Sequence, residues 1–395
     1  MINKTWIEIS KSALLHNVGQ FLSLLDHAPA KDRRLQKPQF MAVVKSNAYG
    51  HGLREVTGIL HNSKFLIPNS SIWFGVDNLD EARAVREITS HNPVLVLGYT
   101  QSERLKEAAK LGARITVYNW ETLKTLTHNS SRITHNPLRV HVKVETGTTR
   151  QGVGEDEAVD FVRALKKIKG VEVEGISTHF ADSEDSQSDY ALKQLARYNS
   201  IIKRLNGTGL TIPIHHMACS AATLLYPQSH GNLVRVGIGM YGLWPFDEAR
   251  IKNYESRIMK IRLRPVLTWK AIVAQVKDAP KGTPIGYNLT ERVKRDSKVA
   301  VLPVGYWDGY DRGLSGTGEV LVNGKRCKIL GRVCMNMLMV DMTDAGNVKP
   351  EDEAVLIGAQ GRQIITADEI AKKLSTINYE IVTRINPVLP RLVRA

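Results

Sequence analysis

The sequence predicts an α/β protein in two parts, an N-terminal (β/α)8 barrel of the TIM type over residues 1–257 and a C-terminal mostly-β domain over residues 258–395. Three observations lead to this fold class. The first 240 or so residues alternate short apolar runs with amphipathic segments, and from about Ile258 strand-like runs and turns dominate instead. The length of 395 residues is enough for one large barrel and a smaller domain.

Eight short apolar runs, rich in β-branched residues, carry the barrel prediction. The predicted strands are Gln39–Val44, Ile72–Val76, Pro93–Gly98, Ile115–Tyr118, Arg139–Val144, Val173–His179, His215–Ser220 and Val234–Gly239, and the helix-like stretches around them are Ser12–Leu25, Asp80–Ile88, Ser102–Leu111, Asp156–Ile168 and Asp189–Leu205. Runs that are apolar throughout are typical of parallel strands buried on both faces. Eight repeats favour a closed barrel with its chemistry at the carboxyl ends of the strands. An open, doubly wound sheet would give a similar pattern.

The C-terminal part has strand-like runs separated by turns. The predicted strands are Leu267–Val276, Lys298–Val304, Glu319–Val322, Cys327–Val333, Met337–Asp341 and Glu353–Ile357. The pair Asn323-Gly324 stands between two of them and is a strong hairpin signal. We expect a first strand at about residues 3–10 to pair with this domain.

The composition excludes several classes of protein. No stretch approaches the roughly 18–20 uncharged apolar residues that a membrane-spanning helix needs, so no membrane partner is expected. The N-terminus lacks the basic start and apolar centre of a signal peptide, and we expect a cytoplasmic protein.

Neither the charge nor the cysteines indicate a special partner. The net charge is +15, but lysine and arginine are spread among acidic residues rather than clustered, so we expect no nucleic-acid partner. The three cysteines, Cys219, Cys327 and Cys334, have neither a disulfide framework nor metal-ligand spacing. We therefore expect reduced thiols and no metal.

Lys45 directly follows the first predicted strand, in the segment AVVKSNAYGHG at residues 42–52. A lysine at this place lies at the mouth of the barrel and is partly buried. Burial disfavours the charged form of an amine, which suits Schiff-base chemistry. A lysine that ends a strand is more often simply solvated. The glycines that follow suggest a loop whose backbone can approach a ligand closely.

Two further strands end in polar residues. In the segment HVKVETGTTRQG at residues 141–152, a turn leads from Lys143 to Arg150, whose guanidinium could grip a carboxylate or make a surface ion pair. In ISTHFAD at residues 176–182, His179 is either a catalytic group or a satisfied core residue.

The last two barrel strands end in groups suited to an anion. Ser220 could cap a helix, and a capping serine also lies where a phosphate would bind. The glycines around Ile238, beginning with Gly237, offer backbone N–H groups at a position that is a frequent phosphate site in barrels. Arg235 lies within the apolar run itself, where a guanidinium needs a partner.

In this order along the chain, the motifs resemble those of the alanine racemases, a fold-type III family of pyridoxal-phosphate enzymes with a (β/α)8 barrel and a C-terminal β-domain. The resemblance extends from Trp6 to Arg391, and its most specific part is VKSNAYGHG at residues 44–52. It implies an isomerase that uses pyridoxal 5'-phosphate to interconvert L- and D-alanine by a two-base mechanism. Such an enzyme supplies D-alanine for peptidoglycan.

The resemblance also implies roles for residues of the barrel. Lys45 is implied to form the Schiff base with the cofactor and to act as one catalytic base. Arg235 is implied to face the pyridine nitrogen, with His179 beside it. The residues implied to bind the cofactor phosphate are Tyr49, Ser220, Gly237 and Ile238. Arg150 is implied on the substrate side, positioned by Lys143, which is carbamylated in some members.

In the second domain, Tyr287 matches the catalytic tyrosine, and Tyr306 and Met335 match residues at the substrate entrance. The family places these three in the partner subunit's active site, which implies a homodimer with shared active sites. Racemisation removes a proton from one face of Cα and returns one to the other, so two acid/base groups must flank the substrate. Lys45 and Tyr287 are groups of suitable type.

Three positions depart from the family pattern. Asn336 stands where aspartate is frequent, Pro387 where many members have a tyrosine that reaches the phosphate, and Cys219 where asparagine is common. These departures bear on substrate breadth and cofactor affinity rather than on the reaction.

Three other functions are weighed against alanine racemisation. A broad-specificity amino-acid racemase is the nearest, although such enzymes are usually exported. A fold-type III decarboxylase would typically have a carboxylate in place of Arg235. A pyridoxal-phosphate homeostasis protein would end after the barrel and lack Tyr287.

Overall fold

The structure is a computed structural model that describes residues 3–26, 38–63, 72–129, 137–185, 187–246 and 258–395. The chain forms two compact units. One comprises residues 15–48 and 56–264, and the other residues 1–14, 49–55 and 265–395. The expected domain boundary after residue 257 falls at the edge of residues 247–257, which lie outside the described residues. Within the described ranges, no helix is both long and apolar enough to cross a membrane.

The first unit contains the predicted barrel, which is confirmed. Its strands are β2 (Gln39–Val43), β3 (Trp73–Val76), β4 (Val94–Val96), β5 (Arg114–Val117), β6 (Leu138–Lys143), β7 (Val171–Ser177), β8 (Ile214–His216) and β9 (Leu233–Val236). They pair in parallel in the order β8-β7-β6-β5-β4-β3-β2-β9. Two backbone hydrogen bonds cross the remaining seam between β8 and β9, from Asn232 N to His215 O at 3.1 Å and from Arg235 N to Ala218 O at 3.0 Å. The barrel is therefore nearly closed.

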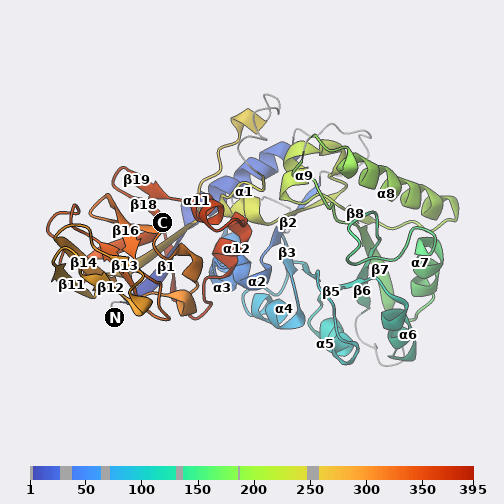
Figure 1. Cartoon of the computed structure of the whole chain (residues 1–395). Helices are drawn as coiled ribbons and strands as arrows, with labels where there is room; N and C mark the ends of the chain where they lie inside the picture. Colours follow the sequence, from blue (N-terminus) through green and yellow to red (C-terminus); the bar gives the residue numbers. More distant parts are fainter. Residues whose placement is uncertain (1–2, 27–37, 64–71, 130–136, 186, 247–257) are drawn as a thin grey trace. The chain divides into compact units, whose positions relative to one another are not determined.

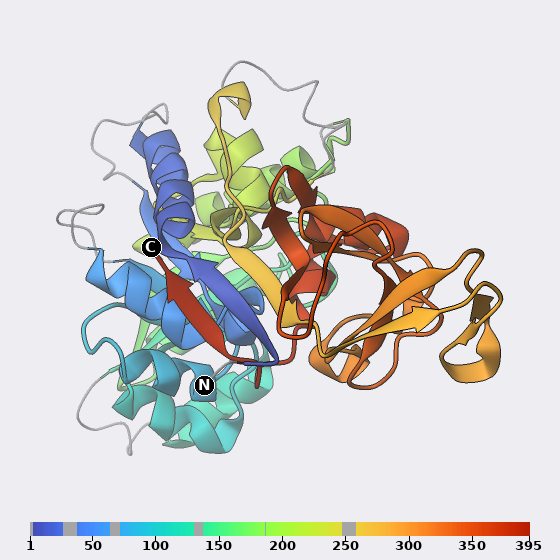
Figure 2. The same ribbon diagram turned by 90° about the vertical axis from the view of Figure 1, so that its left-hand side faces the viewer.

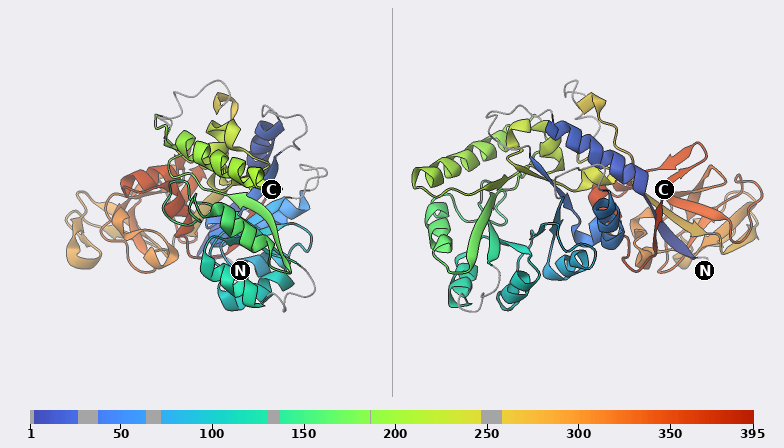
Figure 3. Two further views of the ribbon diagram at one scale, coloured as in Figure 1. Left: turned by 90° about the vertical axis from the view of Figure 1, so that its right-hand side faces the viewer. Right: turned by 180° about the vertical axis from the view of Figure 1, so that it is seen from behind.

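Helices lie on the outer side of these strands (Figures 1 and 3). They are α1 (Lys11–Asp26), α3 (Leu53–Asn62), α4 (Leu79–Arg86), α5 (Leu105–Lys110), α6 (Trp120–Asn129), α7 (Ala158–Lys166), α8 (Tyr190–Gly207) and α9 (Ser220–Leu225). In α7 the buried residues are Ala158, Phe161, Val162 and Leu165, the spacing of a helix with one apolar face. Strands β3 and β4 are buried along their whole length, as expected between helices and a filled interior.

The seventh predicted strand, His215–Ser220, is too long. β8 ends at His216, and Ser220 is already the first residue of α9. After β8 the Arg235 side chain donates to the carbonyl oxygens of His216 and Met217 at 2.7 and 3.0 Å, and the chain then turns into α9.

The second unit is mostly β. Its strands are β1 (Thr5–Ser10), β10 (Leu267–Ile272), β11 (Gln275–Ala279), β12 (Pro284–Ile285), β13 (Glu291–Arg292), β14 (Ser297–Leu302), β15 (Glu319–Val322), β16 (Lys325–Leu330), β17 (Leu338–Asp341), β18 (Glu353–Gln360), β19 (Gln363–Ile365) and β20 (Arg391–Arg394), with helices α11 (Ala367–Lys373) and α12 (Asn378–Thr383). β1 pairs antiparallel with β10 and parallel with β20, the last strand of the chain (Figure 2).

The predicted strand Leu267–Val276 is wrong in one respect, because it is two strands. At the break, Val273 N donates to Asp352 O at 2.8 Å and Ala274 N donates to Val301 O at 2.8 Å. β10 pairs with β18, whereas β11 pairs with β14. The chain changes partners at this point, and the apolar pattern carries no sign of the change.

Candidate active site

Lys45 stands at the carboxyl end of β2, where the backbone makes a left-handed turn. In the segment α2 (Lys45–Tyr49), residues 46–49 have φ angles of 53–55°. L-residues in this conformation are strained by roughly 1–2 kcal/mol each. Glu81 holds the turn, because its carboxylate accepts the amide hydrogens of Ser46 at 2.7 Å and Asn47 at 3.4 Å. Strain of this kind clusters at functional sites, and here it redirects the chain immediately after Lys45.

Lys143, the last residue of β6, is half-buried in the same unit. Its Nζ donates to Gln151 Oε1 at 3.0 Å, and the Gln151 amide donates to the Tyr118 hydroxyl at 3.2 Å. Burial, followed by the charges of Arg235 and Arg150, lowers the pKa of Lys143 to about 7. The amine is therefore nucleophilic near neutral pH.

Arg150 lies on a turn that a single carboxylate organises. Glu145 accepts backbone hydrogens from Gly147 at 2.5 Å, Thr148 at 2.6 Å and Arg150 at 3.2 Å. Burial alone would raise the pKa of Glu145, but these backbone hydrogen bonds lower it. These bonds fix the backbone of the turn, and the Arg150 side chain is exposed, where its guanidinium can bind a carboxylate.

Arg235 is 7% exposed, and its Nη hydrogens are directed at neutral protein acceptors. Nη1 donates to Nδ1 and to the carbonyl oxygen of His216, both at 2.7 Å. Nη2 donates to the carbonyl oxygens of Thr178 and Met217 at 2.8 and 3.0 Å, with His179 Nδ1 at 3.4 Å. Burial lowers the pKa of Arg235 to about 10, so the group stays charged at neutral pH. The Nε–H remains as the donor that a ligand can use.

His179 shows how the site residues converge. The pKa of His179 lies well below its usual range. Burial is the main cause, and the next is the positive charge of Arg235, Lys143, Arg150 and Lys45. The imidazole is therefore neutral, and the carboxyl end of the barrel is electropositive. Four of the predicted site residues thus act on a fifth.

Ser220 does not cap a helix, contrary to one of the two sequence interpretations. The cap of α9 is Cys219, and no side chain bonds there. Instead, Ser220 Oγ accepts the amide hydrogens of Gly237 at 3.0 Å and Gly239 at 3.3 Å, on either side of Ile238. Because Ser220 Oγ accepts both amide hydrogens, its own hydroxyl hydrogen can donate to a phosphate oxygen.

The remaining predicted site residues belong to the second unit. Tyr287, Tyr306 and Met335 are exposed by 71%, 42% and 55%. Backbone hydrogen bonds of 3.0 and 2.9 Å join residues 306–307 to residues 334–335 and bring two of the three loops together. Large side chains are thus exposed on the second unit at all three predicted positions.

The surroundings of Tyr49 and of the three positions that depart from the family pattern can be described residue by residue. The Tyr49 ring lies 6.1 Å from the ring of Tyr379. Cys219 Sγ is 3.2 Å from Ser183 Oγ, and burial raises the pKa of this thiol. Asn336 and Pro387 are both exposed.

Comparison with known proteins decides the family. The model of the alanine racemase N-terminal domain matches residues 9–245, and that of the alanine racemase C-terminal domain matches residues 266–393. The chain belongs to the alanine racemase family. It is 36% identical over 388 residues to alanine racemase 1 of Oceanobacillus iheyensis, covering 98% of this chain and 97% of that one, and 35% identical over 390 residues to alanine racemase of Methanococcus maripaludis, covering 98% of each.

Solved structures of alanine racemases have the same fold. The enzyme of Clostridium difficile has a TM-score of 0.87 at 30% identity, over 100% of this chain and 96% of that one. The Bacillus anthracis enzyme, solved with bound L-Ala-P, has a TM-score of 0.87 at 32% identity with the same coverage. The family is one of pyridoxal-phosphate-dependent alanine racemases, so the predicted fold, reaction and enzyme class are confirmed.

The described residues fit pyridoxal phosphate. Lys45 is partly buried at the carboxyl end of β2, and its amine is a group that can form a Schiff base. The Nε–H of Arg235 can donate to a ring nitrogen, and the Ser220 hydroxyl, which accepts from Gly237 and Gly239, can donate its own hydrogen to a phosphate oxygen. The surplus of positive charge beside His179 suits an anion.

Sequence reasoning missed three residues behind Arg235. His216, His141 and Glu174 continue the hydrogen-bond chain that starts at the guanidinium. A signal was present, because both histidines stand in apolar strands, where a polar side chain needs a partner.

Proposed function

We propose that this chain interconverts L- and D-alanine with Lys45 and Tyr287 as the two acid/base groups, working from opposite faces of the substrate. The observation that carries this proposal is the convergence of Lys45, Lys143, Arg150 and Arg235 around one neutral histidine at the carboxyl end of the barrel. This arrangement suits an amino acid held through its carboxylate beside an anionic cofactor.

Pyridoxal phosphate, when bound, would supply an electron sink that acidifies the Cα hydrogen. Lys45 would hold it covalently, and Ser220 with the amides of Gly237 and Ile238 would hold its phosphate, together with Tyr49. Arg235 would donate its Nε–H to the ring nitrogen. A guanidinium does not give up its proton, so Arg235 keeps the ring nitrogen unprotonated and the sink weak. A weak sink favours return of the proton to Cα over side reactions.

Arg150 would bind the substrate carboxylate in this scheme. We propose that Lys143 is carbamylated and positions Arg150, because an amine with a pKa of about 7 is available to react with carbon dioxide. The modification would replace one of four crowded cations by an anion. That change would relieve the repulsion between Lys143 and Arg150.

We also propose a homodimer in which Tyr287, Tyr306 and Met335 complete the partner's site. The support is their exposure, together with that of Trp307, which is 61% exposed. The reaction would take place in the cytoplasm and supply D-alanine for peptidoglycan.

The experiment is a D-amino-acid assay across a panel of L-amino acids, with borohydride reduction and peptide mass mapping of the loaded protein. We expect D-alanine as the main product and covalent pyridoxal phosphate on Lys45. The variant Lys45→Ala should lose both. Covalent label elsewhere, or full activity of Lys45→Ala without added amine, would refute the assignment.

The same panel tests a second candidate, a broad-specificity racemase. Pro387 favours it, because a proline replaces a tyrosine that would limit substrate size. Comparable rates with larger amino acids would establish the broader function.

A further inference from the structure

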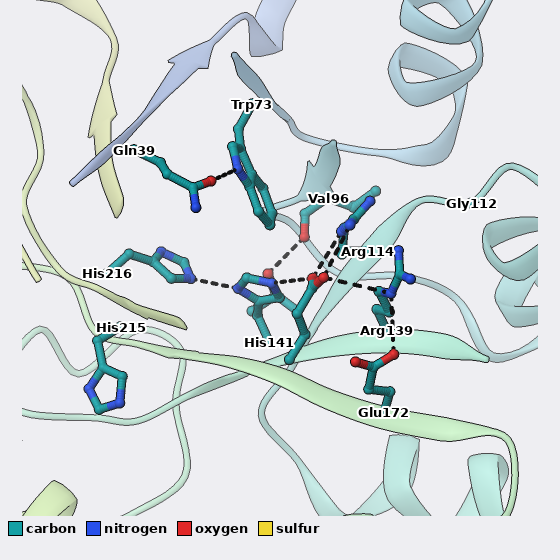
Figure 4. A network of polar contacts seen from close by, with 12 residues as sticks. Gln39, Trp73, Val96, Gly112, Arg114, Arg139, His141, Glu172, His215 and His216 are labelled. Atoms are coloured by element: carbon teal, nitrogen blue, oxygen red, sulfur yellow. Dashed lines mark hydrogen bonds and ion pairs between the residues drawn. The ribbon is translucent and has the colours of Figure 1, made fainter. Parts of the chain in front are cut away.

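A row of polar side chains runs from Arg235 on β9 through His216 on β8 and His141 on β6 to Glu174 on β7. Arg235 Nη1 lies 2.7 Å from His216 Nδ1, and His216 Nε2 lies 2.8 Å from His141 Nδ1. His141 Nε2 lies 3.0 Å from Glu174 Oε2. Figure 4 shows His216 and His141 side by side, with Arg114 beyond His141. The histidines and Arg235 are 0–7% exposed, so water does not interrupt the row.

Glu174 is anchored at the far end as a carboxylate. Arg114 donates to both of its oxygens, from Nε at 2.9 Å and from Nη2 at 3.1 Å. The Arg114 guanidinium also lies 5.0 Å over the Trp73 ring, which fixes its orientation. Burial alone would raise the pKa of Glu174, but the hydrogen bonds from His141 and Arg114 lower it to about 2.

The fold makes room for this row. The pairing of β6 with β7 is irregular between Val140 and His141, and a Cβ on Gly175 would lie 2.2 Å from His141 Nδ1. A residue with a side chain at position 175 would therefore displace the imidazole. The irregularity and the glycine together place the His141 ring between His216 and Glu174.

The chemistry of the two ends determines every proton in between. Both histidines are neutral, because burial lowers the pKa of each. The Glu174 carboxylate can only accept, so His141 carries its hydrogen on Nε2 and leaves Nδ1 as an acceptor. His216 must then donate from Nε2, which leaves its own Nδ1 free to accept from Arg235. All three hydrogen bonds point the same way, from the arginine to the glutamate.

We propose that Glu174 is a positioning residue for the reaction, which sets the tautomers of His141 and His216 and thereby holds the Arg235 guanidinium with its Nε–H facing the reaction centre. This inference rests on the proposed role of Arg235 at the ring nitrogen. The direct partners of Arg235 are neutral. The Glu174 carboxylate provides a negative charge at the end of the row, and the hydrogen bonds of His216 and His141 are oriented toward it.

The substitution Glu174→Gln removes the carboxylate that fixes the two histidine tautomers. A carboxamide has one acceptor oxygen, and Arg114 needs an acceptor at both positions. Glu174 Oε2 accepts from both His141 Nε2 and Arg114 Nε, whereas Oε1 accepts from Arg114 Nη2. With the amide oxygen at the Oε1 position, the NH2 group faces His141 Nε2 and favours its Nδ1–H tautomer, which sets the His216 Nδ1–H against the Arg235 N–H. With the oxygen at the Oε2 position, the hydrogen bond from His141 remains but the NH2 group meets Arg114 Nη2. Neither orientation satisfies every donor, so the two tautomers are no longer fixed.

The first measurement is 15N NMR of the histidine side chains in the full chain, with and without pyridoxal phosphate. We expect His141 and His216 both protonated at Nε2 in both samples. In Glu174→Gln, His216 should become a mixture of the Nδ1–H and Nε2–H forms. A wild-type His216 protonated at Nδ1 would overturn the proposal, whatever the variant does.

The second measurement compares kcat and KM for alanine. We expect Glu174→Gln to lower kcat by about 10- to 100-fold, the usual cost of losing a group that orients another functional side chain, with little change in KM. Glu174→Asp, which keeps the charge, should recover part of kcat and the wild-type tautomers. The matched control is Glu172→Gln, on the same strand and exposed, whose carboxylate pairs with Arg139 at 3.2 Å. It should leave kcat and both tautomers unchanged.

Two results would contradict the inference. One is an unchanged kcat in a folded Glu174→Gln, and the other is an equal loss in Glu172→Gln. If one of these two results is obtained and the wild type makes D-alanine, the proposed function stands. Glu174 then has only a structural role. If the wild type makes none, the proposed function fails, and the tautomer measurement still decides whether Glu174 sets the histidines.

Discussion

Burial acts alike on Lys143 and Arg235 but leaves them in different states. The pKa of Lys143 falls to about 7 and that of Arg235 to about 10, in both cases chiefly because the barrel excludes water. At neutral pH the amine is therefore partly uncharged and reactive, whereas the guanidinium remains a cation. The proposed mechanism uses both states, because Lys143 is the group to be modified and Arg235 is the group that holds a fixed charge.

The lowered pKa of Lys143 predicts a pH-dependent cost in stability. The unfolded chain binds this proton up to about pH 10.5, the folded chain only up to about pH 7. The unfavourable contribution is thus full below pH 7 and disappears as the pH rises to 10.5. We expect Lys143→Gln to gain more stability over the wild type at pH 7 than at pH 10. Urea unfolding in carbon-dioxide-free buffer measures the two differences. Equal differences at both pH values would show that Lys143 titrates normally.

At the scale of elements, the positive φ angle of Gly50 could be expected from its residue type, whereas the positive φ angles of residues 46–49 could not. Gly50 has φ of +83°, and a Cβ there would lie 1.9 Å from the carbonyl oxygen of Val382 in α12. Its own carbonyl accepts from Arg391 at 3.0 and 3.2 Å. We expect Gly50→Ala to destabilise its unit by at least about 2 kcal/mol, because the backbone is both strained and blocked.

The matched control is Gly58→Ala in the middle of α3. Nothing lies within 4 Å of a Cβ at Gly58, and its φ is not positive. Alanine is there better than glycine by about 0.5–1 kcal/mol, so this variant should be slightly more stable. Thermal unfolding of both variants decides the matter. A Gly50→Ala protein as stable as the control would mean that α12 does not pack against Gly50.

The barrel strands could be predicted because burial on both faces leaves continuous apolar runs, and Arg235 stood out as a charge in such a run. The left-handed turn after Lys45 could not be predicted, because Ser46 and Ala48 favour other conformations and tertiary bonds to Glu81 hold them. Helices α3 and α6 were not predicted. α6 is rich in threonine, so its local preference for helix is weak.

Some site residues could be placed from sequence only through the family resemblance. Tyr287 and Met335 occur in turns without periodicity, and nothing in their neighbours indicates catalysis. His141 and Glu174 matter through a bond network between strands, and such partners cannot be read from a single strand. His216 could be predicted in part, because a guanidinium within an apolar run, such as that of Arg235, needs a hydrogen-bond acceptor nearby.

For the whole molecule, the proposed sharing of active sites predicts complementation between two inactive variants. Lys45→Ala lacks the barrel base and Tyr287→Phe lacks the phenol. If the two groups meet across a dimer, mixing after dissociation and reassociation should restore about one native site in each heterodimer. Each variant treated alone is the control. No recovery of activity in proven heterodimers would mean that both groups belong to one subunit.

The most direct test of the account is exchange of the Cα hydrogen with solvent deuterium in Tyr287→Phe. Loss of a positioned acid/base group should slow racemisation in both directions by about 10²–10⁴-fold. Exchange in heavy water, followed by NMR from each enantiomer separately, should survive for D-alanine, which we assign to Lys45, and fail for L-alanine. Equal loss of exchange from both enantiomers would contradict the assignment of Lys45 and Tyr287 to opposite faces of the substrate.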